Sequence, residues 1–226
     1  MKTQVSTIIR DVETALNEID PNQASFVGDR DHSDLQTLIE SKIEESVDRI
    51  HRQADISRMA LDATIDIHYD GDTSDPRFRF RQKTGVLNIL LRSHTEGFDD
   101  TFGVDMLRMV SARSKSWPFA VRDVIYADDP LYEIVTDRYV GAQSDFPAVT
   151  WKKKRIDTDG RRVVVSTLEL RCLNSSDEWA DVCVIPRAKI QNGLVDVDSA
   201  LYHEVIGEIV NKLGIRKPWS SERRAK

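Results

Sequence analysis

Three groups of basic side chains in this sequence could bind nucleic acid. Arg77, Arg79 and Arg81 alternate with Phe78 and Phe80, so a strand there would carry the arginines on one face and the aromatic rings on the other. Lys and Arg neutralise phosphates and release counterions, which suits sequence-independent contact. The alternative is that these cations pair with acidic neighbours or with another subunit. The other two groups are Lys152, Lys153, Lys154 and Arg155 beside Trp151, and Arg216, Lys217, Arg223, Arg224 and Lys226 at the end of the sequence.

Motifs that are typical of enzymes are absent or incomplete. The sequence has no Walker A loop, no GxGxxG and no GxSxG. His203-Glu204 begins like the zinc motif HExxH, but Gly207 occupies the position of the second histidine. Lys83-Thr84-Gly85 matches the KTG box of penicillin-recognising enzymes, yet no serine has a lysine three residues later, so we interpret it as a turn. We predict no catalytic residues, no cofactor and no enzymatic activity.

The carboxylates give no complete metal pattern either. Asp70, Asp72 and Asp75 could ligate calcium, but their spacing misses the EF-hand loop, and we expect a solvated turn. Glu169 lies two residues before Arg171 on an expected strand and lacks an upstream aspartate partner on a neighbouring strand. We predict no metal site. A divergent metal-dependent enzyme stays an alternative hypothesis, built on Asp70, Asp72, Glu169 or His203.

Composition excludes several classes of protein. The longest apolar run is shorter than the ~18–20 residues of a membrane helix, and the first residues lack the apolar region of a secretory signal. Two cysteines cannot form a disulfide scaffold. Cys172 and Cys183 flank a turn and could lie on adjacent strands, and we expect both to be buried free thiols. The net charge of −6 divides into −10 over residues 1–150 and +4 over residues 151–226. A chain whose body is acidic and whose final third is basic has surfaces of opposite sign.

Periodicity predicts an α+β fold with mostly antiparallel strands. Apolar residues at three- and four-residue steps predict a helical hairpin over 3–53 and a helix over 198–213. Between them, residues 60–190 alternate with period two and contain turn signals, which predicts β-hairpins. Asp129-Pro130 is typical of a helix start. We predict one domain over 1–214, followed by a flexible basic tail over 215–226.

Several stretches resemble the head–tail connector proteins of tailed phages, also called adaptor or neck ring proteins. The stretch over 103–111, GVDMLRMVS, resembles a segment that is common in neck and tail-tube proteins, although Val104 and Met106 depart from its usual proline and phenylalanine. Ring proteins of crAss-like phages are the nearest group. The other stretches follow in the same order along the chain: Asp34–Glu40, Asp129–Tyr132, Asp137–Tyr139 and Phe146–Val149.

The resemblance implies a structural virion protein of the neck or tail, assembled in the host cytoplasm. It implies a homo-oligomeric ring, typically twelvefold, below the portal protein and next to other neck or tail proteins, with genomic DNA passing through its lumen and no membrane partner. The alternative is a nucleic-acid-binding accessory protein that uses Arg77, Arg79 and Arg81 with Lys152–Arg155. Candidate residues for the subunit interface or the DNA channel are Glu40, Glu44, Asp48, Arg77, Arg79, Arg81, Lys152, Lys153, Lys154, Arg155 and, as an anchor of the tail, Trp219.

Overall fold

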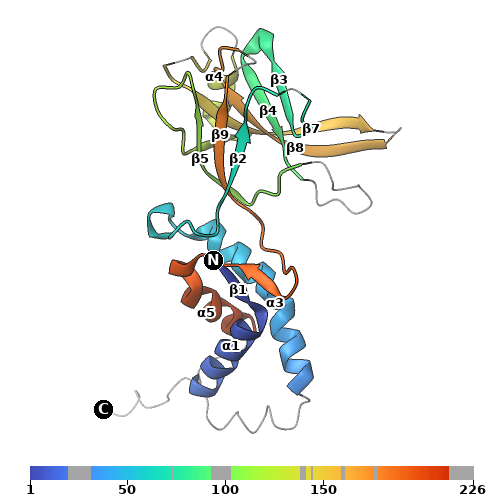
Figure 1. Ribbon diagram of the computed structural model, residues 1–226, viewed down its shortest axis with the longest axis vertical. Coiled ribbons are helices and arrows are strands. Elements are labelled where there is room, and N and C mark those ends of the chain that lie inside the picture. The colour runs from blue at the N-terminus through green and yellow to red at the C-terminus, as the bar shows by residue number, and fades with distance from the viewer. Residues whose placement is uncertain are drawn as a thin grey trace. The chain divides into compact units, whose positions relative to one another are not determined.

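The computed structural model confirms the α+β class and divides the chain into two compact units (Figure 1). It describes residues 1–19, 32–72, 74–92, 103–137, 141–143, 145–158, 161–175 and 178–213. Unit 1 combines residues 1–63 with residues 187–226, and unit 2 is the inserted stretch 64–186. The sequence predicted one domain over 1–214, because no long linker marks the two points where the chain passes between the units.

Unit 1 is a small helical bundle with a two-stranded sheet. Its helices are α1 (Val5–Ile19), α3 (His32–Gln53) and α5 (Tyr202–Lys212), with short 3-10 turns at Ile56–Arg58 and Ser199–Leu201. The helix α5 packs on both α1 and α3, so the predicted hairpin is completed by the last helix. The apolar faces meet in one core, which contains Val5, Ile8, Val12, Leu16, Ile39, Ile43, Val47, Val205, Ile206, Ile209 and Val210.

The first strand of unit 1 replaces part of the predicted first helix. β1 (Lys2–Gln4) pairs antiparallel with β10 (Leu194–Asp196), with Thr3 opposite Val195. The helix therefore begins at Val5, whereas the sequence predicted a start at residue 3. Three residues of strand give too little alternation to be distinguished from the first turn of an amphipathic helix.

Unit 2 consists of two sheets with an apolar core. The three-stranded sheet has the order β2-β9-β5 and the five-stranded sheet has the order β3-β4-β8-β7-β6. All pairs are antiparallel except β6 with β7. The strands are β2 (Ile65–Tyr69), β3 (Phe78–Arg81), β4 (Val86–Leu90), β5 (Arg108–Ser114), β6 (Val124–Tyr126), β7 (Ala148–Thr158), β8 (Arg161–Arg171) and β9 (Ala180–Ile185).

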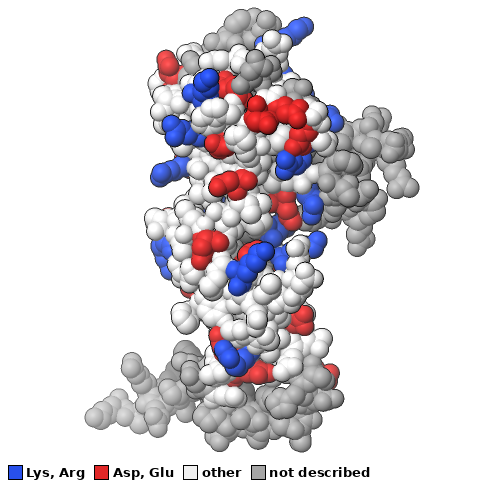
Figure 2. Space-filling view, in the orientation of Figure 1, with Lys and Arg blue, Asp and Glu red and all other residues white. Residues whose placement is uncertain are grey.

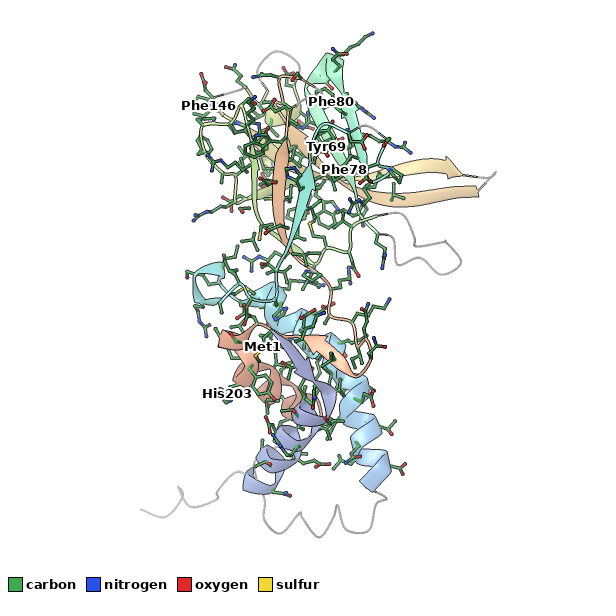
Figure 3. The ribbon with its side chains drawn as sticks, viewed as in Figure 1. Met1, Tyr69, Phe78, Phe80, Phe146 and His203 are labelled. Atoms are coloured by element: carbon green, nitrogen blue, oxygen red, sulfur yellow. The ribbon has the colours of Figure 1, made fainter. Side chains whose placement is uncertain are left out.

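Period-two alternation assigns one face of the five-stranded sheet to the core of unit 2. Phe78, Leu87, Ile89, Leu168 and Leu170 are buried there, and Tyr69 of the other sheet contacts Phe78 with ring centroids 5.2 Å apart (Figure 3). The predicted hairpins 77–81 with 86–91 and 149–156 with 162–170 are both confirmed. The short helix α4 (Pro130–Thr136) begins as predicted, with the Asp129 carboxylate accepting the Leu131 N–H at 2.8 Å.

Candidate functional site: a polar sheet face and a basic arm

The second face of the five-stranded sheet is polar, and the strand register shows how it is built. Arg79 of β3 lies opposite Asn88, which lies opposite Glu169, which lies opposite Thr150. Directly opposed residues share a face, so these four form one row across the sheet. In the neighbouring rows, Arg81, Val86, Arg171 and Ala148 follow one another on one side, and Leu90, Thr167 and Lys152 on the other.

An ion pair lies buried within that polar face. Glu169 has 3% of its surface exposed, and one of its carboxylate oxygens accepts a hydrogen bond from the Arg171 guanidinium at 2.6 Å. Arg171 Nε also donates to the Thr150 hydroxyl at 3.3 Å. The sequence had singled out this Glu-x-Arg stretch as half of a metal pair, whereas the structure occupies the carboxylate with a neighbouring cation. This arrangement fixes the side chains at one end of the sheet.

A cavity of about 600 Å³ adjoins Arg171 at the end of β8. The turn Lys83-Thr84-Gly85 forms part of its wall, as the sequence interpretation of a turn requires: Gly85 has φ of +58°, and a Cβ there would lie 2.6 Å from the Leu173 carbonyl oxygen. Burial raises the pKa of the Cys172 thiol to about 11, so this thiol stays protonated and is a poor nucleophile at neutral pH. The lining residues are Lys83, Thr84, Val135, Thr136, Asp137, Ala142, Arg171 and Cys172.

The strands β7 and β8 extend beyond the rest of the sheet as a two-stranded arm (Figure 1). β7 pairs with β6 only over Val149–Trp151, and β8 pairs with β4 only over residues 167–171. From Lys152 and Ser166 outward the two strands pair with each other as far as Thr158 and Arg161, and no third strand of the described residues joins them. We call residues 152–158 and 161–166 the arm.

The arm is strongly basic, and it contains the predicted basic run. Residues 152–162 hold six Lys or Arg and two Asp, in a chain whose net charge is −6. Lys152 and Lys153 are exposed, and Lys154 and Arg155 continue the same strand opposite Val165 and Val164. At the root of the arm, Trp151 is half-buried. The structure thus places all four predicted cations on an element that projects from its unit.

The three arginines predicted for one strand face, Arg77, Arg79 and Arg81, have different surroundings. Arg79 and Arg81 are exposed, on the face opposite Phe78 as predicted. Arg77 lies just before the strand, where Asp75 accepts hydrogen bonds from its guanidinium at 2.7 to 3.1 Å and holds it over the Phe78 ring. The hydrogen bonds that Arg77 donates to the Asp75 carboxylate raise the pKa of Arg77 above its usual value. Arg77 is therefore a partner of the preceding turn.

The predicted acidic interface on α3 is largely used within unit 1. A Glu44 carboxylate oxygen accepts the Ile190 N–H at 2.7 Å, and a carboxylate oxygen of Asp48 accepts the Ala188 N–H at 2.7 Å. These bonds fasten the segment after residue 186 to the helix, so two of the three predicted carboxylates serve the fold of the unit. Glu40 is exposed. Trp219 and the rest of the basic tail lie outside the described residues.

The other residues of the metal-enzyme alternative do not come together: Asp70 and Asp72 form a turn in unit 2, and His203 belongs to unit 1. Asp70 and Asp72 accept hydrogen bonds from backbone N–H groups two residues later, which confirms the turn between β2 and β3. Acidic side chains gather over this region in Figure 2. His203 is exposed on α5 in unit 1 (Figure 3). Among the described residues no group of three His, Cys, Asp or Glu side chains is placed to hold a metal ion.

The two cysteines do not lie on adjacent strands, so that prediction is wrong. Cys172 follows β8 of the five-stranded sheet, and Cys183 belongs to β9 of the three-stranded sheet. Both are free and half-buried. The turn between them changes the sheet as well as the direction of the chain, which local sequence signals do not encode.

One exposed surface was missed by the sequence reasoning. Tyr126 on the edge strand β6 is 49% exposed, and Leu131 and Ile134 on α4 are 52% and 53% exposed. We call these three residues, with the exposed carboxylates Asp128 and Glu133 among them, the β6–α4 surface. Alternating apolar and acidic residues over 126–134 were interpreted only as a short helix. The sequence did contain one signal for this surface: the stretch has more large apolar residues than so short a helix can bury.

Comparisons with protein-family models, with curated proteins and with solved structures found no match to this chain. None of the helices in the described ranges is both long enough and apolar enough to span a membrane.

Proposed function

We propose that this chain is a structural virion protein, the subunit of a head–tail connector ring below the portal that conducts genome DNA and gives the tail its attachment platform. The observation that carries the proposal is the arm. It is an element of two strands with six basic residues that projects from its sheet, and no third strand of the described residues pairs with it there. Such an element gains its packing from another molecule.

The stretches that resemble connector proteins lie at structurally defined places. The stretch over 103–111 leads into β5 and contributes Met106 and Met109 to the core of unit 2. Asp129-Pro130 begins α4, and Phe146–Val149 leads into β7 at the base of the arm. These three stretches thus belong to the unit that carries the arm and the β6–α4 surface, whereas Asp34–Glu40 lies on α3 of unit 1.

The charge distribution suits a ring around DNA. Ring subunits join head to tail through two different surfaces, which opposite charges can make complementary. A lumen lined by net negative charge repels phosphate and lets the duplex slide, whereas a basic lumen would hold it. A net charge of −6, with the positive charge concentrated in the arm, meets both requirements if the arm faces the neighbouring copy.

Nucleic-acid binding is the second candidate, and a specific observation favours it. A two-stranded β-ribbon fits the major groove of DNA, and the arm is a basic ribbon. Arg79 and Lys152 also lie on the same face of the sheet, on strands three steps apart and two residues offset along the strand, which gives about 16 Å at ~4.8 Å per step and ~3.3 Å per residue. This candidate predicts DNA or RNA binding whose logarithmic affinity falls linearly with the logarithm of salt concentration.

Sedimentation of the purified chain across a wide concentration range tests the ring directly. We expect one large species whose mass is a whole multiple of 25.8 kDa. A chain that stays monomeric at the highest concentration contradicts the proposal.

Titration of labelled duplex DNA at low salt, with the Lys152→Glu, Lys153→Glu double variant beside the wild type, decides the second candidate. Absence of binding at low salt removes it.

A further inference from the structure

The β6–α4 surface has the composition of a docking site. About half of the surface of Tyr126, Leu131 and Ile134 is exposed, although side chains of this size gain stability when they are buried. They lie within one short stretch of chain, across an edge strand and the helix that follows it. A cluster of exposed large apolar side chains on a rim of charges is typical of an interaction surface.

The charges on this surface have one sign. Residues 123–137 hold five Asp or Glu and no Lys or Arg. Asp123, Asp128 and Glu133 are exposed and form no ion pair within the described residues. The occupant of this surface is therefore expected to be basic, with apolar side chains among its cations.

The arm has that composition. Its six Lys or Arg residues stand on two strands that also contain Ile156, Val163 and Val164, whereas Val165 is buried within its own chain. Outward from Val165 the outer edges of both arm strands lack a partner strand among the described residues, whereas on β6 the Tyr126 carbonyl already accepts the Asp129 N–H at 3.0 Å. Charge and apolar content thus match between the arm and the β6–α4 surface.

The root of the arm borders this surface in the same copy, because Trp151 pairs with Tyr126, and only the outer part of the arm is directed away from it. The cavity lining places the end of α4, Val135–Asp137, beside Arg171 at the end of β8. The tip of the arm, around Arg161, is the other end of β8. The strand rises ~3.3 Å per residue, so Arg161 lies about 33 Å from Arg171. In Figure 1 the arm projects on the side opposite the label of α4. A tip that docks on the surface must therefore come from another molecule.

We propose that the arm of one copy docks on the β6–α4 surface of a second copy of this chain. The inference rests on the proposed ring and names the contact that would join its subunits. The two surfaces differ, so the contact is heterologous, and a series of such contacts closes into a ring when the rotation between neighbours permits it. Arg161 and Arg162 at the tip then lie near Asp128 and Glu133.

A charge-swap experiment tests the contact. The arm variant carries Arg161→Glu and Arg162→Glu at the tip, and the surface variant carries Asp128→Lys and Glu133→Lys. We expect each variant alone to weaken self-association at least about tenfold, because like charges then oppose each other. An equimolar mixture of the two variants restores association, since each then meets a neighbour of opposite sign. The variant with all four substitutions also restores it.

A matched control separates the contact from net charge. The Arg79→Glu, Arg81→Glu variant makes the same change of charge on β3, the other edge of the same sheet, and we expect it to self-associate like the wild type. Circular dichroism verifies that each variant folds. The inference is overturned if the arm variant assembles like the wild type, or if neither the mixture nor the fourfold variant is restored.

The outcomes distinguish this inference from the proposed function. If the arm variant still forms the ring that the wild type forms, the proposed ring stands and the proposed arm contact is overturned. Small open oligomers that follow the charge-swap pattern support the contact and contradict a closed ring. A wild-type chain that stays monomeric contradicts both.

Discussion

Tyr126 stacks on Trp151, with ring centroids 5.9 Å apart and ring planes 27° apart. This contact joins the edge strand β6 to β7 at the residue before the arm begins, because Tyr126 and Trp151 are also register partners in the parallel pair. The exposed ring of Tyr126 thus belongs to the β6–α4 surface, while the ring it covers supports the base of the arm.

Tyr126→Ala removes this stack and destabilises unit 2. Aromatic pairs contribute about 0.5–1.5 kcal/mol beyond the area they bury, and we expect a loss of that size in the free energy of unfolding measured with urea. Tyr126→Phe is the matched control and keeps most of the stability, because the ring remains. An unfolding curve of Tyr126→Ala that coincides with that of the wild type would contradict the assigned contact.

Arg171→Met leaves Glu169 without its nearest cation in a buried position. Hydrogen bonds to charged groups contribute about 1.5–3 kcal/mol, and the buried carboxylate adds its desolvation cost, so we expect a loss of about 3 kcal/mol in urea unfolding. The control is Arg79→Met, the same substitution at an exposed arginine of the same sheet, with an expected change within about 0.5 kcal/mol. Equal effects of the two substitutions would show that the Glu169–Arg171 pair contributes nothing.

Asp198 organises the turn before α5. Its carboxylate accepts hydrogen bonds from the N–H groups of Ala60, Leu61 and Ala200 at 2.9 to 3.1 Å, and Leu61 has the left-handed φ of +59°. Asp198→Ala removes a cap and leaves two further donors unpaired, which predicts a loss of about 3 kcal/mol. Thermal unfolding measures it. Glu40→Ala on an exposed helical position serves as the control, and an equal change in both variants would refute this role.

His51 makes the stability of unit 1 depend on pH. Burial lowers its pKa, and its Nε2 accepts the Asp198 N–H at 3.1 Å, which requires the neutral ring. The charged groups around it are the carboxylates of Asp198 and Asp62 and the N-terminal amine. Because the folded state resists protonation, this contribution to stability is complete above the unfolded pKa of about 6.5 and is lost as the pH falls below it.

Urea unfolding at pH 7.5, 6.5 and 5.5 measures this dependence. The wild type is expected to lose stability toward pH 5.5, and His51→Gln to lose less over the same interval. The exposed His203 provides the control, because His203→Gln should keep the profile of the wild type. A His51→Gln profile with the same slope as the wild type would disprove the role of His51.

Local patterns predicted the elements well, and the long-range pairings were not accessible from them. The alternation of Arg79 and Arg81 with Phe78 and Phe80 predicted a strand with one basic and one aromatic face, and Asp129-Pro130 predicted the start of α4. The pairing of β1 with β10 joins residues nearly 200 positions apart, and three residues of strand carry no periodic signal. The two-unit division also depends on such distant contacts.

The candidate site was predicted only in part, because its position also depends on long-range strand pairing. The run Lys152–Arg155 was recognised by its charge alone, but its position on a projecting arm follows from where β6 and β4 stop pairing. Glu44 and Asp48 were placed on an exposed helix face by periodicity, and the structure shows that the returning chain near Ile190 and Ala188 uses both. A helical wheel shows which face is polar and cannot show which backbone N–H groups approach it.

The central claim is that copies of this chain close into a ring. Electron-microscope images of the purified wild-type oligomer, with its mass measured in the same preparation, test that claim most directly. The account predicts closed rings with one rotational symmetry, near twelvefold, and a mass equal to that number of 25.8 kDa chains. A monodisperse monomer at high protein concentration, with no ring in the images, would contradict it.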